Sequence, residues 1–332
     1  MRKNKIMEII GGLDLSEFQV EQITLAVLDM MDLNDEAAST KPVHCQKCNA
    51  THNQFIKKGV CSGKQRYQCK RCNCVFVWDV NKLTYRSQVK RDKWILVLID
   101  TLNLVPLLKT ASHVNLSEPT VFHMRHKFLR CFEELLKNES LEGVIECDDT
   151  FVLESCKGTV AQGRKARRRQ EPASKRGLSN EQVCIMVATD RNGHEIATVI
   201  DREKPSEDAI IKGISNNIGD GCCLITDGLH SFNKLATIRA QKHYIVKNLK
   251  EYTNLIHINT VNSIHSLFKS MIRQYRGVAT KYLNRYCALL VFIRRYLQMD
   301  DNKKLPLVLR DLNTHGIYTK HSTVSSVNLC LI

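Results

Sequence analysis

The stretch Val144-Ile145-Glu146-Cys147-Asp148-Asp149-Thr150-Phe151-Val152 decides the fold. Its apolar and β-branched residues predict a strand, and its acidic residues are unusual inside one. Further strands are predicted at 183–190, 195–200, 222–226 and 243–246, the second and third joined by a hairpin turn at 191–194. Helices are predicted at about 206–218, 231–238 and 261–275.

The order of these elements is three strands, helix, strand, helix, strand, helix. It predicts an α/β ribonuclease H-like core, like that of retroviral integrases. In this layout one acidic residue lies on the first strand, a second follows the fourth strand, and a third projects from a later helix. Those places hold Asp148, Asp227 and Asn262. An isolated Asp at a strand end is usually a cap or turn residue, so it is their joint placement that indicates a site.

The chemistry explains this choice of residues. Moving a phosphodiester requires neutralising its oxygens and activating a water or a 3′-hydroxyl, which two Mg²⁺ (or Mn²⁺) ions about 3.5–4 Å apart can do. Magnesium takes hard oxygen ligands, mainly carboxylates, so the neutral Asn262 leaves the site one charge short. Helical spacing puts a polar set on one side of the last helix, comprising Asn262, His265, Ser266 and Lys269. Lys269 is expected to bind a phosphate as a point charge. The other side carries Ile264, Phe268, Met271 and Tyr275.

Two further acids lie on the first strand. Side chains alternate along a strand, so Glu146 points the same way as Asp148, and Asp149 points to the opposite face. Glu146 can supply the missing charge or pair with a neighbouring cation, and we favour the pairing.

Composition bounds the class of protein. The chain has 332 residues, a formal net charge of +15 and a pI of about 9.2. Such a basic protein usually meets nucleic acid and less often an anionic membrane. No apolar run is long enough to span a bilayer, and the N-terminus lacks a signal-peptide core, so a cytoplasmic protein is expected. The 14 cysteines are then expected to be reduced thiols or metal ligands.

Four of these cysteines form two C-x-x-C pairs, Cys45/Cys48 and Cys69/Cys72. A separation of about 20 residues between the pairs is typical of a zinc ribbon, and the segment is too small to bury its own core without metal. The alternatives are buried cysteines or a redox pair. Basic residues and one aromatic residue suit phosphate contact, although a solvated charged face is nearly as well supported; they are Lys64, Arg66, Tyr67, Lys70 and Arg71.

Residues 88–137 read as helices, in which a short helix, a turn at 113–115 and a basic helix capped by Ser117 fit a helix-turn-helix. The alternative is an ordinary helical hairpin. The candidate DNA-facing residues are Glu118, Thr120, His123, Arg125 and Lys127.

A basic loop separates the first two strands of the core. It contains Arg164, Lys165, Arg167, Arg168 and Arg169, followed by Lys175 and Arg176. Beside a nuclease site it would clamp the DNA backbone, and the alternative is a disordered charged loop. The predicted regions are an N-terminal helix (begun at Ser16) and linker at 1–40, a zinc ribbon at 41–80, a helix-turn-helix region at 81–140, the catalytic core at 141–300 and a tail at 301–332.

Several motifs together resemble one known family. They are the four ribbon cysteines, Gly63–Cys72, Val144–Thr150, Arg176–Ser179, Thr226–Gly228, His257–Lys269 and Arg276–Leu283. Over roughly residues 40–300 the sequence is similar to bacterial insertion-sequence transposases of the DDE superfamily. The matching subgroup has an N-terminal zinc ribbon and Asn in place of the final Glu, a D-D-N-K site. One departure is Asp149, where the family commonly has Glu.

The resemblance implies binding to terminal inverted repeats, strand cleavage, and strand transfer into target DNA. It implies that Asp148, Asp227 and Asn262 ligate magnesium and that Lys269 contacts DNA. We also expect one structural zinc ion, double-stranded DNA as partner, a homo-oligomer on DNA, and association with the nucleoid. The alternative functions are a catalytically inactive or domesticated DNA-binding derivative and a ribonuclease or junction nuclease.

Overall fold

The computed structural model describes residues 42, 45, 47–48, 50–51, 54–61, 64–77, 87–158, 171–174, 177–247, 253, 255–297 and 324. The chain divides into two compact units, Met1–Ile95 with Met299–Thr319, and Leu96–Gln298 with Lys320–Ile332, and each is considered by itself. The predicted N-terminal helix, the basic residues 164–169 and 175–176, and the tail apart from Val324 lie outside the described residues.

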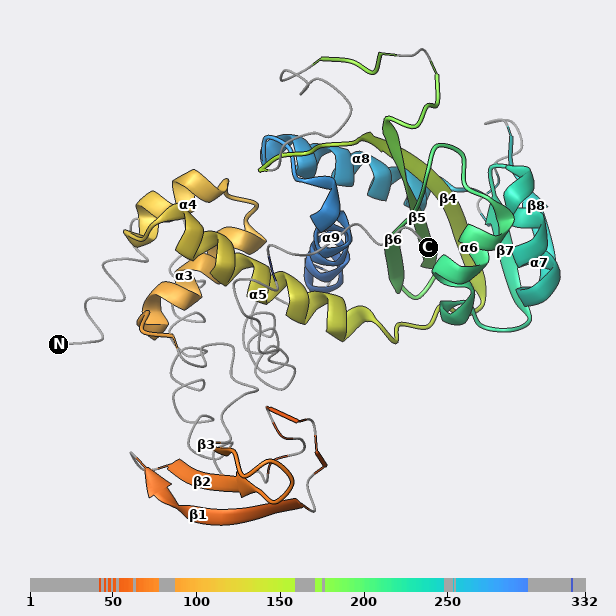
Figure 1. Ribbon diagram of the computed structural model, residues 1–332. Coiled ribbons are helices and arrows are strands. Elements are labelled where there is room, and N and C mark those ends of the chain that lie inside the picture. Colours follow the sequence, from red (N-terminus) through yellow and green to blue (C-terminus); the bar gives the residue numbers. More distant parts are fainter. Residues whose placement is uncertain are drawn as a thin grey trace. The chain divides into compact units, whose positions relative to one another are not determined.

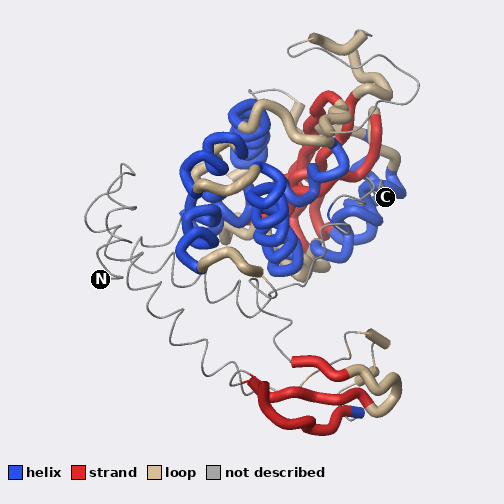
Figure 2. Tube along the Cα trace, turned by 60° about the vertical axis from the view of Figure 1, so that its left-hand side comes forward, coloured by secondary structure: helices blue, strands red, loops and turns tan. Residues whose placement is uncertain are grey.

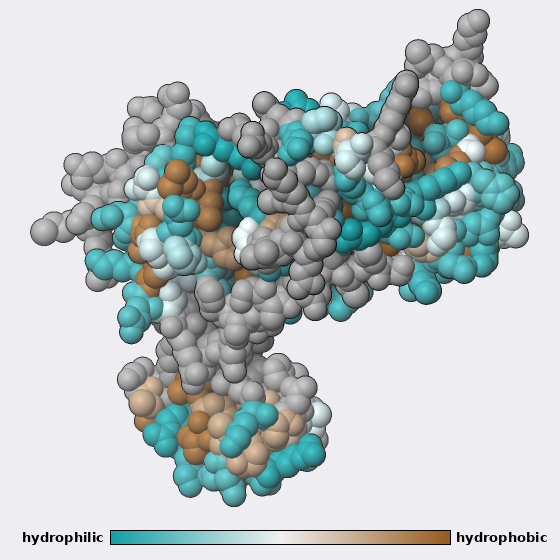
Figure 3. All heavy atoms as spheres, turned by 45° about the horizontal axis from the view of Figure 1, so that its top comes forward, coloured by the Kyte–Doolittle hydropathy of each residue, from teal (hydrophilic) through white to brown (hydrophobic). Residues whose placement is uncertain are grey.

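The first unit contains a three-stranded antiparallel sheet. Its strands are β1 (Phe55–Cys61), β2 (Lys64–Cys69) and β3 (Val75–Val77), in that order across the sheet. Tyr67 and Phe76 form its small core together with Cys45, Ala50 and Cys69. Figure 3 shows apolar side chains among polar ones on the surface of this unit, where Ile56, Val60 and Val75 are exposed. So small a core favours a metal as an additional link.

The second unit is built on a five-stranded sheet with the order β6-β5-β4-β7-β8. The strands are β4 (Val144–Leu153), β5 (Gln182–Asp190), β6 (Glu195–Arg202), β7 (Cys222–Thr226) and β8 (Ala240–Ile245). β4, β5 and β6 form an antiparallel meander, whereas β7 and β8 run parallel to β4. The predicted α/β layout is confirmed, including the turn after Asp190, where Gly193 has a φ of 88°.

Helices cover both faces of this sheet (Figures 1 and 2). α6 (Glu207–Ile214) and α7 (Asn233–Arg239), with the 3₁₀ turns η3 (Ser215–Asn217) and η4 (His230–Phe232), bury one face. The opposite face is covered by α8 (Asn259–Gln274) and α9 (Leu283–Leu297), which follows η6 (Thr280–Tyr282). Along β4, Cys147 belongs to the core beneath α6 and α7, whereas Glu146 contacts α8. The alternation thus directs Glu146 and Asp148 towards α8, as predicted.

Three helices precede the sheet, namely α3 (Arg91–Leu102), α4 (Leu107–Val114) and α5 (Glu118–Leu136). The predicted Ser117 cap is confirmed, since its hydroxyl accepts a hydrogen bond from the N–H of Thr120. α5 packs on α9, and the rings of Phe132 and Phe292 stack with centroids 4.0 Å apart. The predicted region 81–140 is therefore not a separate unit, because α4 and α5 belong to the body of the core. None of the helices formed by described residues is long and apolar enough to cross a bilayer.

Candidate active site and metal centres

Asp148 lies in the middle of β4, opposite Val187 of β5. Its side chain is only 12% exposed, and its Oδ1 accepts a hydrogen bond from the N–H of Asp149 at 2.9 Å. A carboxylate at such a position is costly unless a cation or several donors accompany it.

Asp227 is the first residue after β7, the parallel neighbour of β4. Cys147 pairs with Thr226, so Asp148 and Asp227 each lie one residue further along adjacent strands. The chain turns at once, because Gly228 has a φ of 89°, and a Cβ there would lie 2.5 Å from Ile245 Cγ2. Asp227 Oδ1 accepts the N–H of Leu229 at 2.9 Å, which fixes the turn. The sheet thereby brings two acids together that are far apart in sequence.

The electrostatics of this pair favour a bound cation. Burial, followed by the negative charges of Asp227 and Asp149, raises the pKa of Asp148 to about 7, although the charge of Lys269 opposes the shift. Burial and Asp227 also raise the pKa of Asp149 to about 6. These carboxylates disfavour one another's ionisation, and a divalent cation would relieve that repulsion. The donor set therefore fits magnesium or manganese.

α8 carries the remaining candidates. Asn262, Ser266 and Lys269 are exposed, whereas His265 is buried, with its Nδ1 3.8 Å from Asp148 Oδ2. Burial, then the charge of Lys269, lowers the pKa of His265 to about 4, so the ring is neutral at pH 7. The predicted polar stripe is therefore correct except that His265 turns inward to Asp148. The apolar side is buried as predicted, and comprises Ile264, Phe268 and Met271 of the helix and Tyr275 directly after it.

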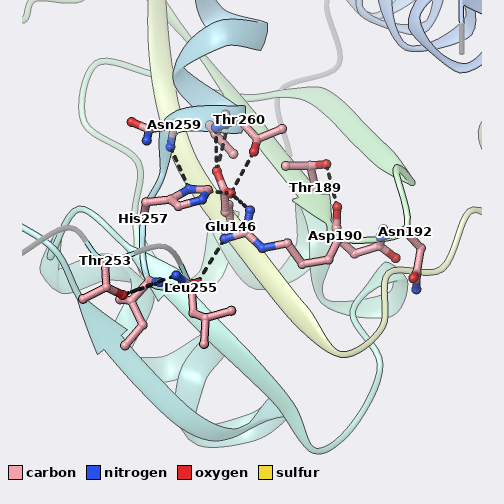
Figure 4. A network of polar contacts seen from close by, with 12 residues as sticks. Glu146, Thr189, Asp190, Asn192, Thr253, Leu255, His257, Asn259 and Thr260 are labelled. Carbon is pink, nitrogen blue, oxygen red and sulfur yellow. Dashed lines mark hydrogen bonds and ion pairs between the residues drawn. The ribbon is translucent and has the colours of Figure 1, made fainter.

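Glu146 does not supply the missing charge to the site. It is 1% exposed and forms an ion pair with Arg191, which confirms the favoured pairing. The same carboxylate accepts hydrogen bonds from the N–H groups of Thr260 and Val261 at 2.9 and 3.1 Å, at the beginning of α8 (Figure 4). This second role could not be predicted from the sequence, because the partners lie more than a hundred residues away.

The four ribbon cysteines meet in one cluster. Their sulfur atoms all lie within 4.8 Å of one another, and the pairs Cys45–Cys72 and Cys48–Cys69 are 3.6 Å apart. A zinc tetrahedron with Zn–S bonds of about 2.3 Å has edges of roughly 3.8 Å, so the thiols fit such an ion. Burial raises the pKa of Cys45, but hydrogen bonds from the backbone N–H groups of Cys48 and Lys47 and from the Cys72 thiol outweigh it, and the pKa is lowered to about 7. All described cysteines are free thiols.

The basic residues of the ribbon differ in their accessibility. Lys70 and Arg71 are exposed in the turn after β2 and are available to a phosphate. Arg66 is half-buried, and Tyr67 is buried in the small core rather than presented at the surface. The tyrosine of this motif thus has a packing role.

The predicted DNA-facing side of α5 is largely internal. Arg125 is 1% exposed, and its Nη2 donates to a backbone carbonyl oxygen at 2.9 Å and to Thr110 Oγ1 at 3.0 Å. Lys127 is 5% exposed, and burial lowers its pKa. Glu118 is exposed at the start of the helix, and Thr120 and His123 are half-buried. The prediction that Arg125 and Lys127 contact DNA is corrected here, because α5 uses this side to pack against its neighbours.

Comparison with known proteins identifies the core. Residues 140–294 match the family described as the ISXO2-like transposase domain. An uncharacterized protein in the transposable element ISH50 of Halobacterium salinarum is 26% identical over 278 residues, which cover 80% of this chain and 90% of that relative. The chain carries the core domain of an insertion-sequence DDE transposase. The match spans Asp148, Asp227, Asn262 and Lys269 of the transposase and leaves the ribbon and α5 outside.

Two solved structures are also similar to the transposase. They are a pre-cleavage Mos1 transpososome, which matches 71% of this chain and 82% of its own at 14% identity, and the Mos1 strand transfer complex, which matches 69% and 79% at 15% identity. Their TM-scores of 0.24 and 0.25 are too low to support a structural argument.

The raised pKa of Asp148 predicts a pH dependence of stability. The folded protein holds a proton on Asp148 up to about pH 7, whereas the unfolded chain loses it near the ordinary pKa of 3.8, so stability falls as pH rises through this window. Asp148→Asn should therefore raise the Tm at pH 8 in buffer without magnesium or manganese and flatten the decline between pH 4 and 7. Thermal unfolding measures both, and the exposed Asp208→Asn is the control. A Tm of Asp148→Asn below that of the wild type at pH 8 contradicts the argument.

The burial of Arg125 predicts a loss of stability on substitution. Arg125→Met leaves the Thr110 hydroxyl and a backbone carbonyl without their donor, at a cost of about 2–3 kcal/mol in the free energy of unfolding. Lys109→Met, an exposed basic residue on α4, should cost less than about 0.5 kcal/mol. Denaturant unfolding measures the difference. An Arg125→Met protein of normal stability but weakened DNA binding would restore the original prediction.

Proposed function

We propose that Asp148, Asp227 and Asn262 hold two divalent cations, Mg²⁺ or Mn²⁺, at which this transposase cleaves its element ends and joins them to target DNA. The observation that carries this proposal is the buried Asp148, its pKa raised to about 7, beside both Asp227 and the helix that bears Asn262. Two such ions neutralise the phosphate oxygens and activate the attacking water or 3′-hydroxyl. The amide oxygen of Asn262 is a hard ligand, although it contributes no charge.

The neighbouring side chains have distinct tasks in this proposal. Lys269 is exposed, yet it is close enough for its charge to oppose the rise in the pKa of Asp148, so its ammonium can hold a phosphate at the edge of the site. His265 is neutral and buried against Asp148, which suits a residue that orients a ligand carboxylate. Neither residue needs to transfer a proton for the chemistry to proceed.

DNA recognition belongs to other parts of the chain in this proposal. Exposed Lys70 and Arg71, together with Arg66, would contact the phosphates of the element ends. Half-buried Thr120 and His123, in the first two turns of α5, remain candidates for DNA contact. The basic loop, with Arg164, Lys165, Arg167, Arg168 and Arg169, is retained as a clamp on the DNA backbone. We further propose that two or more copies assemble on the two ends, and that the protein works at the host nucleoid.

The cysteine cluster is proposed to hold one structural zinc ion. Its four soft ligands and sulfur spacing of 3.6 Å suit zinc, and the three-stranded sheet has only a small core of its own. The ribbon would then present Lys70 and Arg71 on a sheet that the metal keeps folded.

Asn262→Ala tests the third ligand. It should lower strand transfer by about a hundredfold or more while leaving end binding intact. The reason is that the divalent cations, which act on the reacting phosphate, lose one oxygen ligand. The assay uses a supercoiled plasmid carrying the element's two ends with Mg²⁺ or Mn²⁺, and gel shifts report binding. Ser270→Ala, exposed on the same helix, is the matched control. Asp148→Ala should abolish both cleavage and joining. Unchanged transfer by Asn262→Ala means that Asn262 is not a ligand, and end binding without any cleavage by the wild type identifies an inactive DNA-binding derivative.

Replacing a ribbon cysteine tests the zinc site. Cys72→Ser should lose the one bound zinc per chain and most of the affinity for end DNA, because the ribbon depends on its metal to fold. Cys74→Ser is the control, since this cysteine lies in the same segment but outside the cluster. Elemental analysis and gel shifts give the result. Zinc retained by Cys72→Ser, or lost equally by Cys74→Ser, would refute this ligand set.

A further inference from the structure

Glu146, which is itself buried, lies at the centre of a polar network that joins three separate parts of the core (Figure 4). From α8, the backbone N–H and hydroxyl of Thr260 donate to it at 2.9 Å each, and the N–H of Val261 at 3.1 Å. From the turn after β5, Arg191 pairs with the carboxylate and donates to the carbonyl oxygen of Leu255 at 3.2 Å. From the segment before α8, His257 Nδ1 lies 3.2 Å from Glu146 Oε1.

The first contact of the carboxylate is with the N-terminal turn of α8. Thr260 and Val261 belong to the first turn, whose N–H groups have no partners within the helix. Glu146 satisfies two of them, and its charge also complements the positive end of the helix dipole. No side-chain cap stands at Ile258, the residue before the helix. A residue on β4 therefore provides the cap that the local sequence does not.

The second contact between the same two elements is at the candidate active site. Two residues along β4, Asp148 lies 3.8 Å from His265, four residues further along α8. Two strand residues span about 6–7 Å and four helical residues span about 6 Å, so strand and helix advance side by side with matching steps. Asn262 immediately follows Val261, whose N–H donates to Glu146, and precedes His265, which contacts Asp148.

We propose that Glu146 is a positioning residue that fixes the start of α8, so that Asn262 and Lys269 face the cations held by Asp148 and Asp227. The inference rests on the proposed function of that site. Glu146 takes no part in the reaction, because its carboxylate is already occupied by Arg191, Thr260 and Val261. Because Glu146 lies on β4 and binds the start of α8, it determines where Asn262 lies relative to Asp148.

A purely structural role predicts something different. A buried Glu–Arg pair also stabilises the far edge of the same sheet, where Glu195 accepts two hydrogen bonds of 2.8 Å from Arg294 and is 4% exposed. Loss of that pair should reduce stability without affecting the metal requirement. Glu195→Ala is therefore a matched control for Glu146→Ala.

The experiment compares both variants with Thr260→Val and the wild type as full-length, zinc-loaded proteins. Strand cleavage of the plasmid carrying both element ends is titrated with Mg²⁺, and amide hydrogen exchange is measured on the same proteins without magnesium. Glu146→Ala should raise the half-maximal Mg²⁺ concentration by about 10- to 100-fold, as loss of a residue that orients metal ligands usually does. Thr260→Val, which removes one donor, should raise it by about threefold. Exchange should accelerate over residues 259–265 in both, but Glu195→Ala should change neither quantity.

Several outcomes would overturn the proposal. One is a magnesium midpoint for Glu146→Ala no different from that of Glu195→Ala, and another is unaltered exchange at the start of α8. If Glu146→Ala does not fold, Thr260→Val decides, and wild-type values for it count against the proposal. Failure of the proposed function looks different, because Asp148→Ala would then cleave as the wild type does. If Asp148→Ala is inactive but Glu146→Ala has the magnesium midpoint and exchange rates of the wild type, the positioning role alone is refuted.

Discussion

The repulsion between Asp148 and Asp227 is the constraint on which the rest of the structure depends. Adjacent parallel strands bring the two carboxylates together, and burial removes much of the water that would screen them. Holding them there requires a rigid support, which the apolar layer beneath α6 and α7 provides through Cys147, Met186 and Phe232. Without a cation the site costs stability, as the raised pKa of Asp148 records. The sheet thus holds two carboxylates that repel each other at a place where a bound metal cation would stabilise both.

Two acids on one strand have very different surroundings. Glu146 has donors from a helix N-terminus, a hydroxyl and a guanidinium, and needs no metal. Among the described residues, Asp148 is accompanied only by the N–H of its own neighbour and a neutral histidine, with the charge of Lys269 acting on it as well. Their side chains point to the same face and lie two residues apart, so position on the strand alone does not distinguish them. The number of donors supplied by distant segments does.

Much of the fold could be predicted from the sequence. Periodicity and turn residues placed all five strands of the core within a few residues, and β7 was predicted with its observed bounds. The candidate acids followed from the strand order. What could not be predicted depends on contacts between remote segments. The inward turn of His265 and the cap that Glu146 provides for α8 arise only when β4 and α8 lie side by side.

Net charge was a less reliable guide to the roles of individual residues than the periodic pattern of apolar residues was to the fold. A net charge of +15 favours nucleic acid, but it does not tell which cations face it. Arg125 and Lys127 lie on a helix that also packs against α9, and the long aliphatic part of each side chain suits burial. Charge on an amphipathic helix therefore indicates a DNA-binding surface only where the apolar stripe lies elsewhere.

The neutral side chain of Asn262 leaves the site less short of negative charge than the replacement of a carboxylate by an amide implies. Asp149 points away from α8, towards Cys184, yet burial and then the negative charge of Asp227 raise its pKa to about 6. Its field therefore reaches the same region from the opposite face of the sheet. Three carboxylates then act on any bound cation, of which Asp148 and Asp227 are candidate ligands and Asp149 contributes at longer range. An amide on α8 can complete the ligand set because the strands already supply the negative charge, and a fourth carboxylate would add to the repulsion that the metal-free fold must withstand.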